Sequence, residues 1–410
     1  MTHQSGTVLF ALSGKADADN IAPVIWSLAR GGTPVVLYIV DEAVYHEMRS
    51  AWWRSECPHV EIHRVRIAGT PKIRKRLHQL RWNRWVVRRV LRQSDVRLVV
   101  MEWGEGVANR QVSRWRRITQ WLATDFVLQL QLAAQHTGTP TVALPHGHST
   151  KTTMIRSQHV QAVMDANAGR LPFADRDSYA AYVFGSAYHR DVIVGHSTMS
   201  GKNTQVWGSA RFNDEWVSRL YTATTAADLP PLRATQQRRV LLFVPKWHNL
   251  VDRSGTLQLI AALGGCEQVQ LVVRGHLRAG DATLTPQEQM MLERTDNIIL
   301  VGDYVSSPSL IKACDVLVDV DSSIAFDAVL LGKPYVRPRY LQDASVRTIW
   351  DTLGGAHQTD SLADTVALLA KEILLPAPRD AQFEQVVFGG EGVDVLRRYR
   401  DGLLAIASSE

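Results

Sequence analysis

Cysteine is scarce in this chain, and long apolar runs are missing. The 410 residues include only three cysteines, which lie far apart and show no CxxC spacing. This pattern argues against a disulfide framework and predicts a reducing compartment. No run of about 18 apolar residues occurs, so no membrane-spanning helix is expected. The first apolar stretch, Thr7 to Leu12, is too short for a signal peptide and lacks its basic lead, so we expect a cytoplasmic protein.

Several binding signatures are also missing. There is no P-loop, no GxGxxG fingerprint, and no cluster of His, Cys and carboxylates with the spacing of a zinc site. We therefore expect no metal and no required cofactor. The hydrophobic fraction of 45% and the charged fraction of 21% are ordinary for a folded protein and exclude disorder. A chain of 410 residues exceeds what one core usually organises, which predicts two domains.

Short apolar runs alternate with longer amphipathic segments throughout the chain. Such alternation predicts parallel sheets covered by helices on both faces, an α/β fold. The expected strands are Thr7 to Leu12, Pro34 to Val40, Val60 to Ile67, Arg97 to Met101, Thr139 to Leu144, Arg239 to Val244, Val269 to Arg274, Ile298 to Val301, Val316 to Val318 and Pro334 to Val336. The second half thus repeats the architecture of the first.

The alternation stops between Thr222 and Gln237, where two prolines stand among small residues. This segment is the predicted linker between an N-terminal Rossmann-like domain, residues 1–222, and a C-terminal one, residues 238–380. Residues 381–410 are expected to form a helix that packs back towards the N-terminal domain. Because ligands of parallel sheets bind outside the carboxyl ends of the strands, we expect the site in a central cleft where the two sheets face each other.

The most specific motif is ACDVLVDVDSSIAFDAVLLGKPYV, residues 313–336. A strand ends near Asp319, and Ser322 and Ser323 open a helix in which Asp327 lies one turn on. Free backbone N–H groups at such a helix start, with the positive end of the helix dipole behind them, bind phosphate. Serines that only cap the helix are the alternative. Asp319 and Asp321 also permit a metal-binding DxD interpretation, which we do not favour because anions beside the serines oppose phosphate.

This serine run resembles the "LITDYSS-xxFD" segment of the CDP-glycerol glycerophosphotransferases, which polymerise teichoic acids and capsules. Three further segments resemble motifs of that family in the same order: VALPHGH at 142–148, GSARF at 208–212 and VPKWHN at 244–249. The resemblance covers roughly residues 130–400. It implies a GT-B fold, a nucleotide-activated donor and, at 142–148, a loop that supplies an active-site histidine.

The resemblance also implies donor-binding residues, and the chain departs from the family at some of them. Asp321 replaces an aromatic residue, His248 replaces an arginine, and no proline follows His276. These departures lie where donor specificity is set, so a CMP-, CDP- or UDP-linked donor and a sugar or polyol phosphate group all stay open. The expected donor-binding residues are Ser322, Ser323, Arg274, Lys246, Asp327, Arg211 and His248.

Histidines and carboxylates at predicted strand ends are the candidate proton acceptors. His146 lies between a proline and a glycine after a strand, where it can take the proton of an attacking hydroxyl. His148, two residues on, leaves the assignment between the two histidines open, and Glu102, Glu105 and His148 are placed on the acceptor side. His276 is the second catalytic candidate. With Arg274 and Lys246 it can neutralise a leaving nucleotide.

Positive charge and tryptophan coincide in the first 121 residues. These hold 20 Lys and Arg against 10 Asp and Glu, together with eight of the 12 tryptophans. Much of this lies in a predicted helix from Pro71 to Gln93 whose basic aromatic side can rest on an anionic membrane. The alternatives are a core-packed helix with a solvated basic face, or single-stranded nucleic acid, for which no supporting motif occurs. The predicted membrane face comprises Arg74, Arg81, Trp82, Arg84, Trp85 and Arg88.

These features predict a GT-B transferase that passes a nucleotide-activated group to a polymer or lipid-linked acceptor at the inner membrane face. Nucleic acid is not an expected partner. One alternative is a non-hydrolysing nucleotide-sugar epimerase on the same fold, although the first strand and loop lack the start typical of that family. The other is a basic binding module without catalysis. Donor base, acceptor, stereochemical course, number of transfers and oligomeric state are not predicted.

Overall fold

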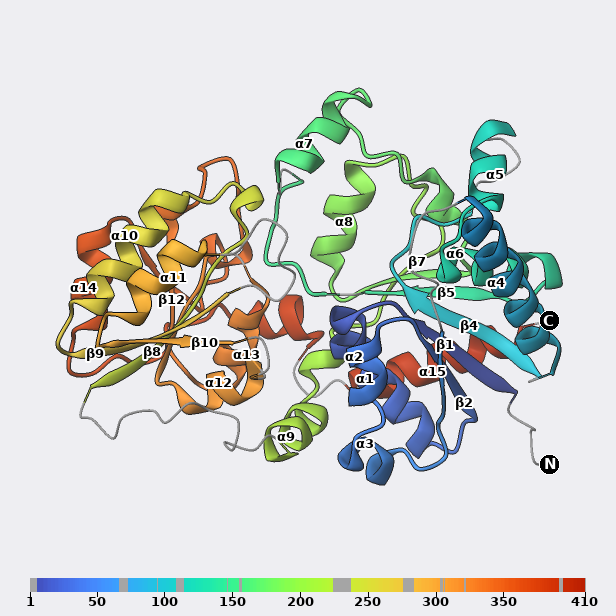
Figure 1. Ribbon diagram of the computed structural model, residues 1–410, viewed down its shortest axis with the longest axis horizontal. Coiled ribbons are helices and arrows are strands. Elements are labelled where there is room, and N and C mark those ends of the chain that lie inside the picture. The colour runs from blue at the N-terminus through green and yellow to red at the C-terminus, as the bar shows by residue number, and fades with distance from the viewer. Residues whose placement is uncertain are drawn as a thin grey trace. The chain divides into compact units, whose positions relative to one another are not determined.

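The computed structural model describes residues 6–65, 73–93, 95–107, 114–145, 147–154, 157–223, 237–275, 284–302, 305, 307–320, 322–390 and 394–409. The chain divides into two compact units (Figure 1). Unit 1 comprises Met1–His148, Arg170–Asn213 and Gln385–Glu410, and unit 2 comprises Ser149–Gly169 and Asp214–Glu384. Each unit is built on one sheet.

Unit 1 contains a seven-stranded parallel sheet in the order β3-β2-β1-β4-β5-β6-β7. Its strands are β1 (Thr7–Leu12), β2 (Val35–Ile39), β3 (Glu61–Arg64), β4 (Val96–Glu102), β5 (Thr141–Leu144), β6 (Ala181–Phe184) and β7 (Thr204–Val206). Its helices are α1 (Lys15–Arg30), α2 (Glu42–Glu47), α3 (Ala51–Glu56), α4 (Ile73–Gln93), α5 (Arg114–Trp121), α6 (Phe126–Thr137), α8 (Ala187–Gly195) and α15 (Val395–Ser408). Short turns of 3-10 helix lie at η1 (Ala174–Ser178) and η2 (Ala210–Phe212), and the π-helical turn η7 (Glu384–Phe388) spans the boundary between the units.

The apolar runs of the sequence form the centre of the unit 1 sheet. β1 and β5 are buried almost throughout, because both faces of a parallel sheet are covered by helices. The C-terminal helix α15 packs against α1 and β4, so the red end of the chain in Figure 1 lies among the blue elements. The Tyr399 hydroxyl of α15 donates a hydrogen bond of 2.9 Å to the carbonyl oxygen of Gly208. The last helix therefore completes the core of unit 1.

Unit 2 contains a six-stranded parallel sheet in the order β10-β9-β8-β11-β12-β13. Its strands are β8 (Arg238–Phe243), β9 (Val269–Arg274), β10 (Ile298–Val301), β11 (Val316–Val318), β12 (Tyr335–Pro338) and β13 (His357–Thr359). Its helices are α7 (Gln158–Asp165), α9 (Asp214–Ala223), α10 (Arg253–Gly264), α11 (Pro286–Glu293), α12 (Ser307–Ala313), α13 (Ile324–Leu330) and α14 (Leu362–Leu369). The 3-10 turns are η4 (Trp247–Asn249), η5 (Arg339–Leu341) and η6 (Ile349–Asp351).

The predicted α/β class with two parallel sheets is confirmed, and every expected strand is present within a few residues. Three further strands, β6, β7 and β13, were not expected from the sequence. β7 and β13 are three residues long and carry polar residues such as Gln205 and His357, so they give no apolar signal. Most of the predicted linker, residues 224–236, lies outside the described residues.

The segment Ser149–Gly169 joins unit 2 although it follows strand β5 of unit 1. It pairs antiparallel with residues near η6, through an isolated bridge between Lys151 and Thr348. The Thr152 amide donates to the Arg347 carbonyl at 2.9 Å, and the Ile349 amide donates to the Thr150 carbonyl at 2.8 Å. The chain therefore leaves unit 1 directly after the VALPHGH segment and is held by unit 2.

The three cysteines, Cys57, Cys266 and Cys314, are buried free thiols. Burial raises the pKa of Cys57 and of Cys314 to about 12, so these thiols are not nucleophiles at neutral pH. In the described part of the chain, no helix combines the length and the apolar character needed to cross a bilayer.

Candidate functional site

Both sheets share one strand order, in which the first strand of the unit lies between the second and the fourth. The order reverses between the first and fourth strands, and ligands of such sheets bind at the carboxyl ends of the strands beside this switch point. In unit 2 the switch point lies between β8 and β11. Lys246 follows β8, Ser322 follows β11, and Arg274 is the last residue of the neighbouring β9. Three donor-binding residues expected from the sequence therefore lie at, or a few residues beyond, the carboxyl ends of three adjacent strands.

The turn between β11 and α13 is held by its own polar groups. The Ser322 amide donates to Asp319 Oδ2 at 2.7 Å, and the Ile324 amide lies 3.3 Å from Ser322 Oγ. The Ala325 and Phe326 amides donate to the carbonyls of Ser322 and Ser323. The expectation that the amides around Ser323 are free for phosphate thus needs correction, because four of them already have acceptors within the turn.

Asp319 acts as a structural carboxylate in this turn. It is buried, and it accepts the Ser322 amide, which explains why a carboxylate stands beside the serines. Among the described residues, no group of three or more His, Cys, Asp or Glu side chains is placed to hold a metal ion. Asp321 lies outside the described residues.

Strand β12 supports the serine turn from the next strand of the sheet. The Tyr335 hydroxyl donates to the Asp319 carbonyl at 3.1 Å, and Arg337 Nε donates to the Val320 carbonyl at 3.3 Å. The guanidinium of Arg337 is buried and forms a 2.8 Å ion pair with Asp351. Gln342 and Gln358 accept its remaining bonds at 2.7 and 2.9 Å. Arg337 was not among the residues expected from the sequence, although an arginine inside an apolar strand is itself a signal of a buried partner.

The other donor-binding candidates lie in different surroundings. Arg274 is buried, with its guanidinium 6.0 Å from the Phe243 ring, and Asp327 is buried within α13. Lys246 is half-buried and His248 is exposed in η4. Arg211 belongs to unit 1. His276 lies outside the described residues.

In unit 1 the candidate proton acceptors follow adjacent strands. Glu102, the last residue of β4, is paired in register with Leu144, the last residue of β5. The VALPHGH segment therefore leaves the sheet beside Glu102, at the carboxyl edge. His146 itself lies outside the described residues. Glu105 is exposed in the loop after β4.

His148 follows β5 and lies against Gly185, the residue directly after the neighbouring strand β6. Its ring centroid is 6.0 Å from that of Phe212, and a Cβ added to Gly185 would lie 2.9 Å from His148 Nδ1. Burial, and to a smaller extent the positive charge of Arg211, lowers the pKa of His148 to about 4. The imidazole is therefore neutral at pH 7, with one nitrogen able to accept a proton or hydrogen bond.

This pKa predicts how the stability of unit 1 depends on pH. Between about pH 6.5 and pH 4 the unfolded histidine binds a proton that the folded His148 does not bind, so stability falls as the pH is lowered through this window. The expected loss is on the order of 2 to 3 kcal/mol. Urea unfolding between pH 4 and 7 measures it. His148→Gln is expected to flatten the slope. An unchanged slope in His148→Gln would contradict the assignment.

The switch point of unit 1 was not identified from the sequence as a site. It lies between β1 and β4, where Ser13, Gly14 and Lys15 follow β1 and Glu102 ends β4. The sequence signal for this site was the pair Ser13 and Gly14, followed by Lys15 at the start of α1. These residues extend the candidate site of unit 1 by one strand.

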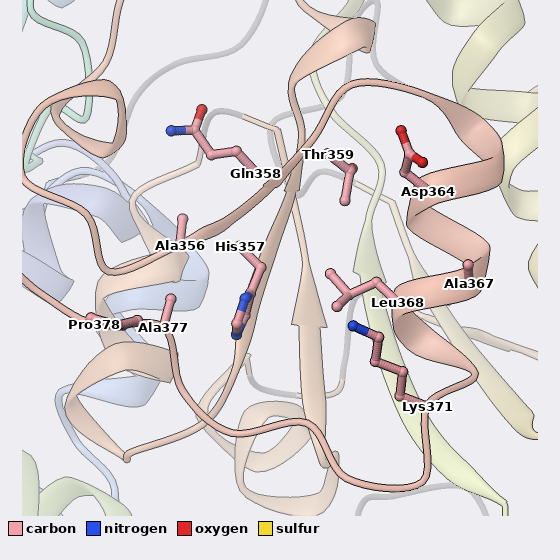
Figure 2. Close-up of a pocket in the computed structure, with 10 residues that line it drawn as sticks. All are labelled: Ala356, His357, Gln358, Thr359, Asp364, Ala367, Leu368, Lys371, Ala377 and Pro378. Atoms are coloured by element: carbon pink, nitrogen blue, oxygen red, sulfur yellow. The ribbon is translucent and has the colours of Figure 1, made fainter.

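A hollow of about 520 Å³ lies elsewhere in unit 2, between the edge strand β13 and α14 (Figure 2). His357 and Lys371 line it, and His357 Nε2 lies 2.7 Å from the Leu375 carbonyl. Strand β12 separates β13 from β11 in the sheet. The switch-point residues do not line this hollow, which therefore serves as an internal control for binding experiments.

Helix α4 is packed against the core on one side and is basic on the other. Leu80, Asn83 and Val87 are buried, and Arg81 and Arg88 are exposed. Trp85 is half exposed. Arg84 is partly buried: it lies over the Trp121 ring, and its Nε donates to Gln129 Oε1 at 3.3 Å. The side chains of Arg74 and Trp82 lie outside the described residues.

The chain matches no protein-family model and no curated protein sequence. It is similar in structure to UDP-GlcNAc 2-epimerase from Methanocaldococcus jannaschii, with a TM-score of 0.57 at 11% identity over 96% of this chain and 99% of that one. UDP-GlcNAc 2-epimerase from Neisseria meningitidis, bound to UDP-GlcNAc, has a TM-score of 0.57 at 14% identity over 98% and 94%. Anabaena HepE in complex with UDP and glucose has a TM-score of 0.50 at 14% identity over 98% and 95%. At such identities the likeness shows the fold alone, and the predicted GT-B fold is confirmed.

Proposed function

We propose that this protein is an enzyme that takes a nucleotide-activated donor and transfers the activated group to a hydroxyl of a polymer or lipid-linked acceptor. The observation that carries the proposal is the placement of Arg274, Lys246 and Ser322 at three adjacent strand ends around the switch point of unit 2. Two cations and a hydroxyl beside a switch point suit a diphosphate. Solved structures of similar fold are bound to UDP-GlcNAc or to UDP and glucose, which supports a nucleotide-sugar donor.

Each unit has its own part in the proposed reaction. In unit 2, Lys246 and Arg274 neutralise the negative charge that grows on the nucleotide as the donor bond breaks, and Ser322 and Ser323 hold a phosphate oxygen. His276 is proposed as a further cation for the leaving nucleotide. In unit 1, His146 takes the proton of the attacking hydroxyl. These roles are proposals.

Nucleotide binding tests the donor site directly. Isothermal titration with UDP, CDP and CMP is expected to show one preferred nucleotide, and Lys246→Ala is expected to weaken it about tenfold or more because it removes a charge-assisted hydrogen bond. Lys371→Ala, in the hollow of Figure 2, is the matched control and leaves binding unchanged. If no nucleotide binds, or if Lys371→Ala has the larger effect, the assignment of the donor site is wrong.

Two kinds of transferred group suit the proposed donor site, a polyol phosphate and a sugar. The resemblance of residues 313–336 to the glycerophosphotransferases favours a CDP-linked polyol phosphate and a teichoic-acid-like acceptor, whereas the UDP-bound structures favour a UDP-sugar. A panel of CMP-, CDP- and UDP-linked donors, assayed for release of the free nucleotide, separates these two. Release of CMP from CDP-glycerol supports the former, and release of UDP supports the latter.

Epimerisation of a UDP-sugar is the second candidate function. It is favoured by one observation, that the two structures described above with a TM-score of 0.57 are UDP-GlcNAc 2-epimerases. Proton NMR of UDP-GlcNAc incubated with the protein alone decides between the two reactions. A second UDP-linked sugar that appears without an acceptor identifies an epimerase, and nucleotide release that requires an acceptor identifies a transferase.

The role of the VALPHGH segment is tested by two substitutions. His146→Ala is expected to reduce the rate by about a hundredfold or more if it removes the general base. Gly185→Ala is expected to push the His148 ring away, since the new Cβ would lie 2.9 Å from Nδ1, and to lower the rate with little effect on folding. Gly195→Ala, whose added Cβ meets no atom within 4 Å, is the matched control. Full activity in both His146→Ala and Gly185→Ala would remove this segment from the mechanism.

A further inference from the structure

Helix α5 has its polar side towards the protein and its apolar side towards solvent. Gln120 is buried, and its Nε2 donates to the Gly106 carbonyl at 3.2 Å. Arg116 forms a 2.9 Å ion pair with the buried carboxylate of Asp175. On the opposite side lie exposed apolar side chains, with exposed fractions of 72% for Trp115, 38% for Ile118 and 55% for Trp121. Leu122, directly after the helix, is 49% exposed. A surface helix of a globular protein ordinarily has the reverse arrangement.

This reversal is built into the unit 1 fold. The spacing of Arg116 and Gln120, four residues apart, gives α5 one polar stripe, and both of these residues have partners in the protein. Rotating α5 to bury its tryptophans would leave the Asp175 carboxylate buried without its cation. The apolar side of α5 is therefore held outward, and an exposed apolar patch rimmed by polar residues is typical of an interaction surface.

The neighbouring helix α4 brings positive charge next to Trp121, at the edge of this apolar side. Arg84 of α4 lies 3.8 Å from the centroid of the Trp121 ring and donates a hydrogen bond to the Trp121 carbonyl, so the two helices are adjacent there (Figure 1). Arg81 and Arg88 are exposed on the same side of α4 as Arg84, since residues three and seven apart share a helix face. Trp85, also on this side, is 51% exposed. No Asp or Glu occurs between residues 71 and 94 or between residues 107 and 124.

We propose that the exposed sides of α4 and α5 form one docking surface for an anionic lipid bilayer. Tryptophan rings lie at the level of the headgroups, Ile118 and Leu122 enter the boundary of the acyl chains, and the arginines contact lipid phosphates. This surface, defined by Arg81, Arg84, Trp85, Arg88, Trp115, Ile118, Trp121 and Leu122, is named the α4–α5 surface. Both a bilayer and a lipid-linked acceptor present such an interface.

Two other occupants fit the α4–α5 surface less well. Single-stranded nucleic acid would stack its bases on the tryptophans, but Ile118 and Leu122 offer no ring for stacking and gain most from hydrocarbon. A second copy of the chain would bring the two arginine rows together in a symmetric interface, and like charges facing each other are unfavourable. Both occupants are outcomes of the test below.

Binding of the full chain to lipid vesicles tests the inference. Vesicles of phosphatidylcholine with about 30 mol% phosphatidylserine are expected to bind the protein at least about tenfold more tightly than pure phosphatidylcholine, and added salt is expected to weaken this binding. Trp115→Ser, Ile118→Ser and Leu122→Ser combined are expected to weaken it about tenfold or more. Trp121 is left in place because it contacts Arg84. Arg81→Gln with Arg88→Gln is expected to remove the preference for the anionic lipid.

Matched controls separate this surface from apolar and basic residues elsewhere. Met290 and Met291 of α11 are 50% and 69% exposed, so Met290→Ser with Met291→Ser removes exposed apolar area from another helix and leaves vesicle binding unchanged. Arg190→Gln with Arg397→Gln removes the same charge elsewhere on unit 1. Unchanged circular dichroism and melting temperature in the triple variant show that a loss of binding is not a loss of folding.

Three outcomes would overturn the inference. They are no binding to anionic vesicles, equal binding by the triple variant, or binding to oligo(dT) but not to vesicles. A dimer in solution that the triple variant dissociates would instead identify the α4–α5 surface as an interface between copies. The inference deepens the acceptor side of the proposed function, but vesicle binding is measured without donor or turnover. A protein that binds vesicles and shows no turnover therefore contradicts the enzyme proposal alone.

Discussion

Replacement of Arg337 by methionine is expected to lower the free energy of unfolding of unit 2 by about 3 to 5 kcal/mol, because it removes the buried guanidinium that pairs with Asp351 and leaves the Val320 carbonyl, Gln342 and Gln358 without its hydrogen bonds. The remaining cation, Arg339, lies 3.9 Å from the same Asp351 oxygen and is 44% exposed, so it compensates only in small part. The Arg337 and Asp351 side chains are 1% and 12% exposed, and their nitrogen and oxygen lie 2.8 Å apart. Methionine fills a similar volume, so the loss reports the ion pair and its hydrogen bonds and not a cavity. Urea unfolding measures the change, and hydrogen exchange of the β12 amides assigns it to unit 2.

The exposed ion pair between Arg239 and Asp315 supplies the matched control. Its nitrogen and oxygen lie 3.1 Å apart, but its side chains are 39% and 43% exposed. Arg239→Met is therefore expected to cost less than about 1 kcal/mol. Equal losses in the two variants would show that burial does not determine the strength of the Arg337 pair.

Asp351 adds a dependence on pH to the same test. Burial opposes its ionisation, but the hydrogen bond from the Thr348 amide and the charge of Arg337 outweigh burial and hold its pKa below the usual value. Because the folded pKa is depressed, the stabilisation is fully present above about pH 4 and is lost as the pH falls through the folded pKa. Asp351→Asn is expected to remove this acid-sensitive part of the stability. If Asp351→Asn keeps the same acid transition, that transition arises from a group other than Asp351.

The Arg337 network also connects two segments of the candidate site. Arg337 holds the Val320 carbonyl just before the serine turn, and Asp351 accepts the Thr348 amide next to the residues that pair with Thr150. The chain directly after VALPHGH is thus joined within unit 2 to the serine turn. Arg337→Met is accordingly expected to weaken nucleotide binding as well as folding, with Arg337 acting as a positioning residue. Arg337→Lys keeps the positive charge but lacks the several N–H donors of the guanidinium. Compared with Arg337→Met, it is expected to restore part of the stability and a smaller part of the nucleotide binding.

Replacement of Gly106 by alanine is expected to destabilise unit 1 by about 2 to 5 kcal/mol, which combines the cost of a left-handed backbone for alanine with overpacking. Gly106 has φ of +80°, and an added Cβ would lie 2.0 Å from the carbonyl oxygen of Asp175. That oxygen belongs to the backbone of η1, so it cannot rotate away as a side chain can. The Val107 amide donates to Ser178 Oγ at 2.9 Å, which holds the two segments together.

Gly138→Ala is the matched control for Gly106→Ala. Gly138 ends α6 with φ of +76°, but an added Cβ meets no atom within 4 Å. Its substitution therefore carries only the backbone cost, about 1 to 2 kcal/mol. Differential scanning calorimetry of both variants measures the difference. If Gly138→Ala is as unstable as Gly106→Ala, the close approach to Asp175 contributes nothing to stability.

The fold was predictable because its signal is local. A strand buried on both faces of a parallel sheet must be apolar over its whole length, and the runs that became β1, β9 and β11 show this in the sequence. Strand β13 carries His357 and Gln358 at the edge of the sheet, where one side needs no apolar cover, so the sequence held no signal for it. Placing the candidate residues at strand ends followed from the same local reasoning.

What only the tertiary structure decided depends on contacts between residues far apart in the chain. The sequence by itself determined two parallel sheets and put Lys246, Arg274 and the serine pair at carboxyl ends of strands. It did not determine that residues 149–169 pair with residues 347–349, that Arg337 joins Asp351 to the serine turn, or that α5 shows its tryptophans to solvent. The side of α5 that faces the protein is set by the buried carboxylate of Asp175, about 60 residues further along the chain. Helical periodicity shows which residues share a face of a helix, but not which face packs against the protein.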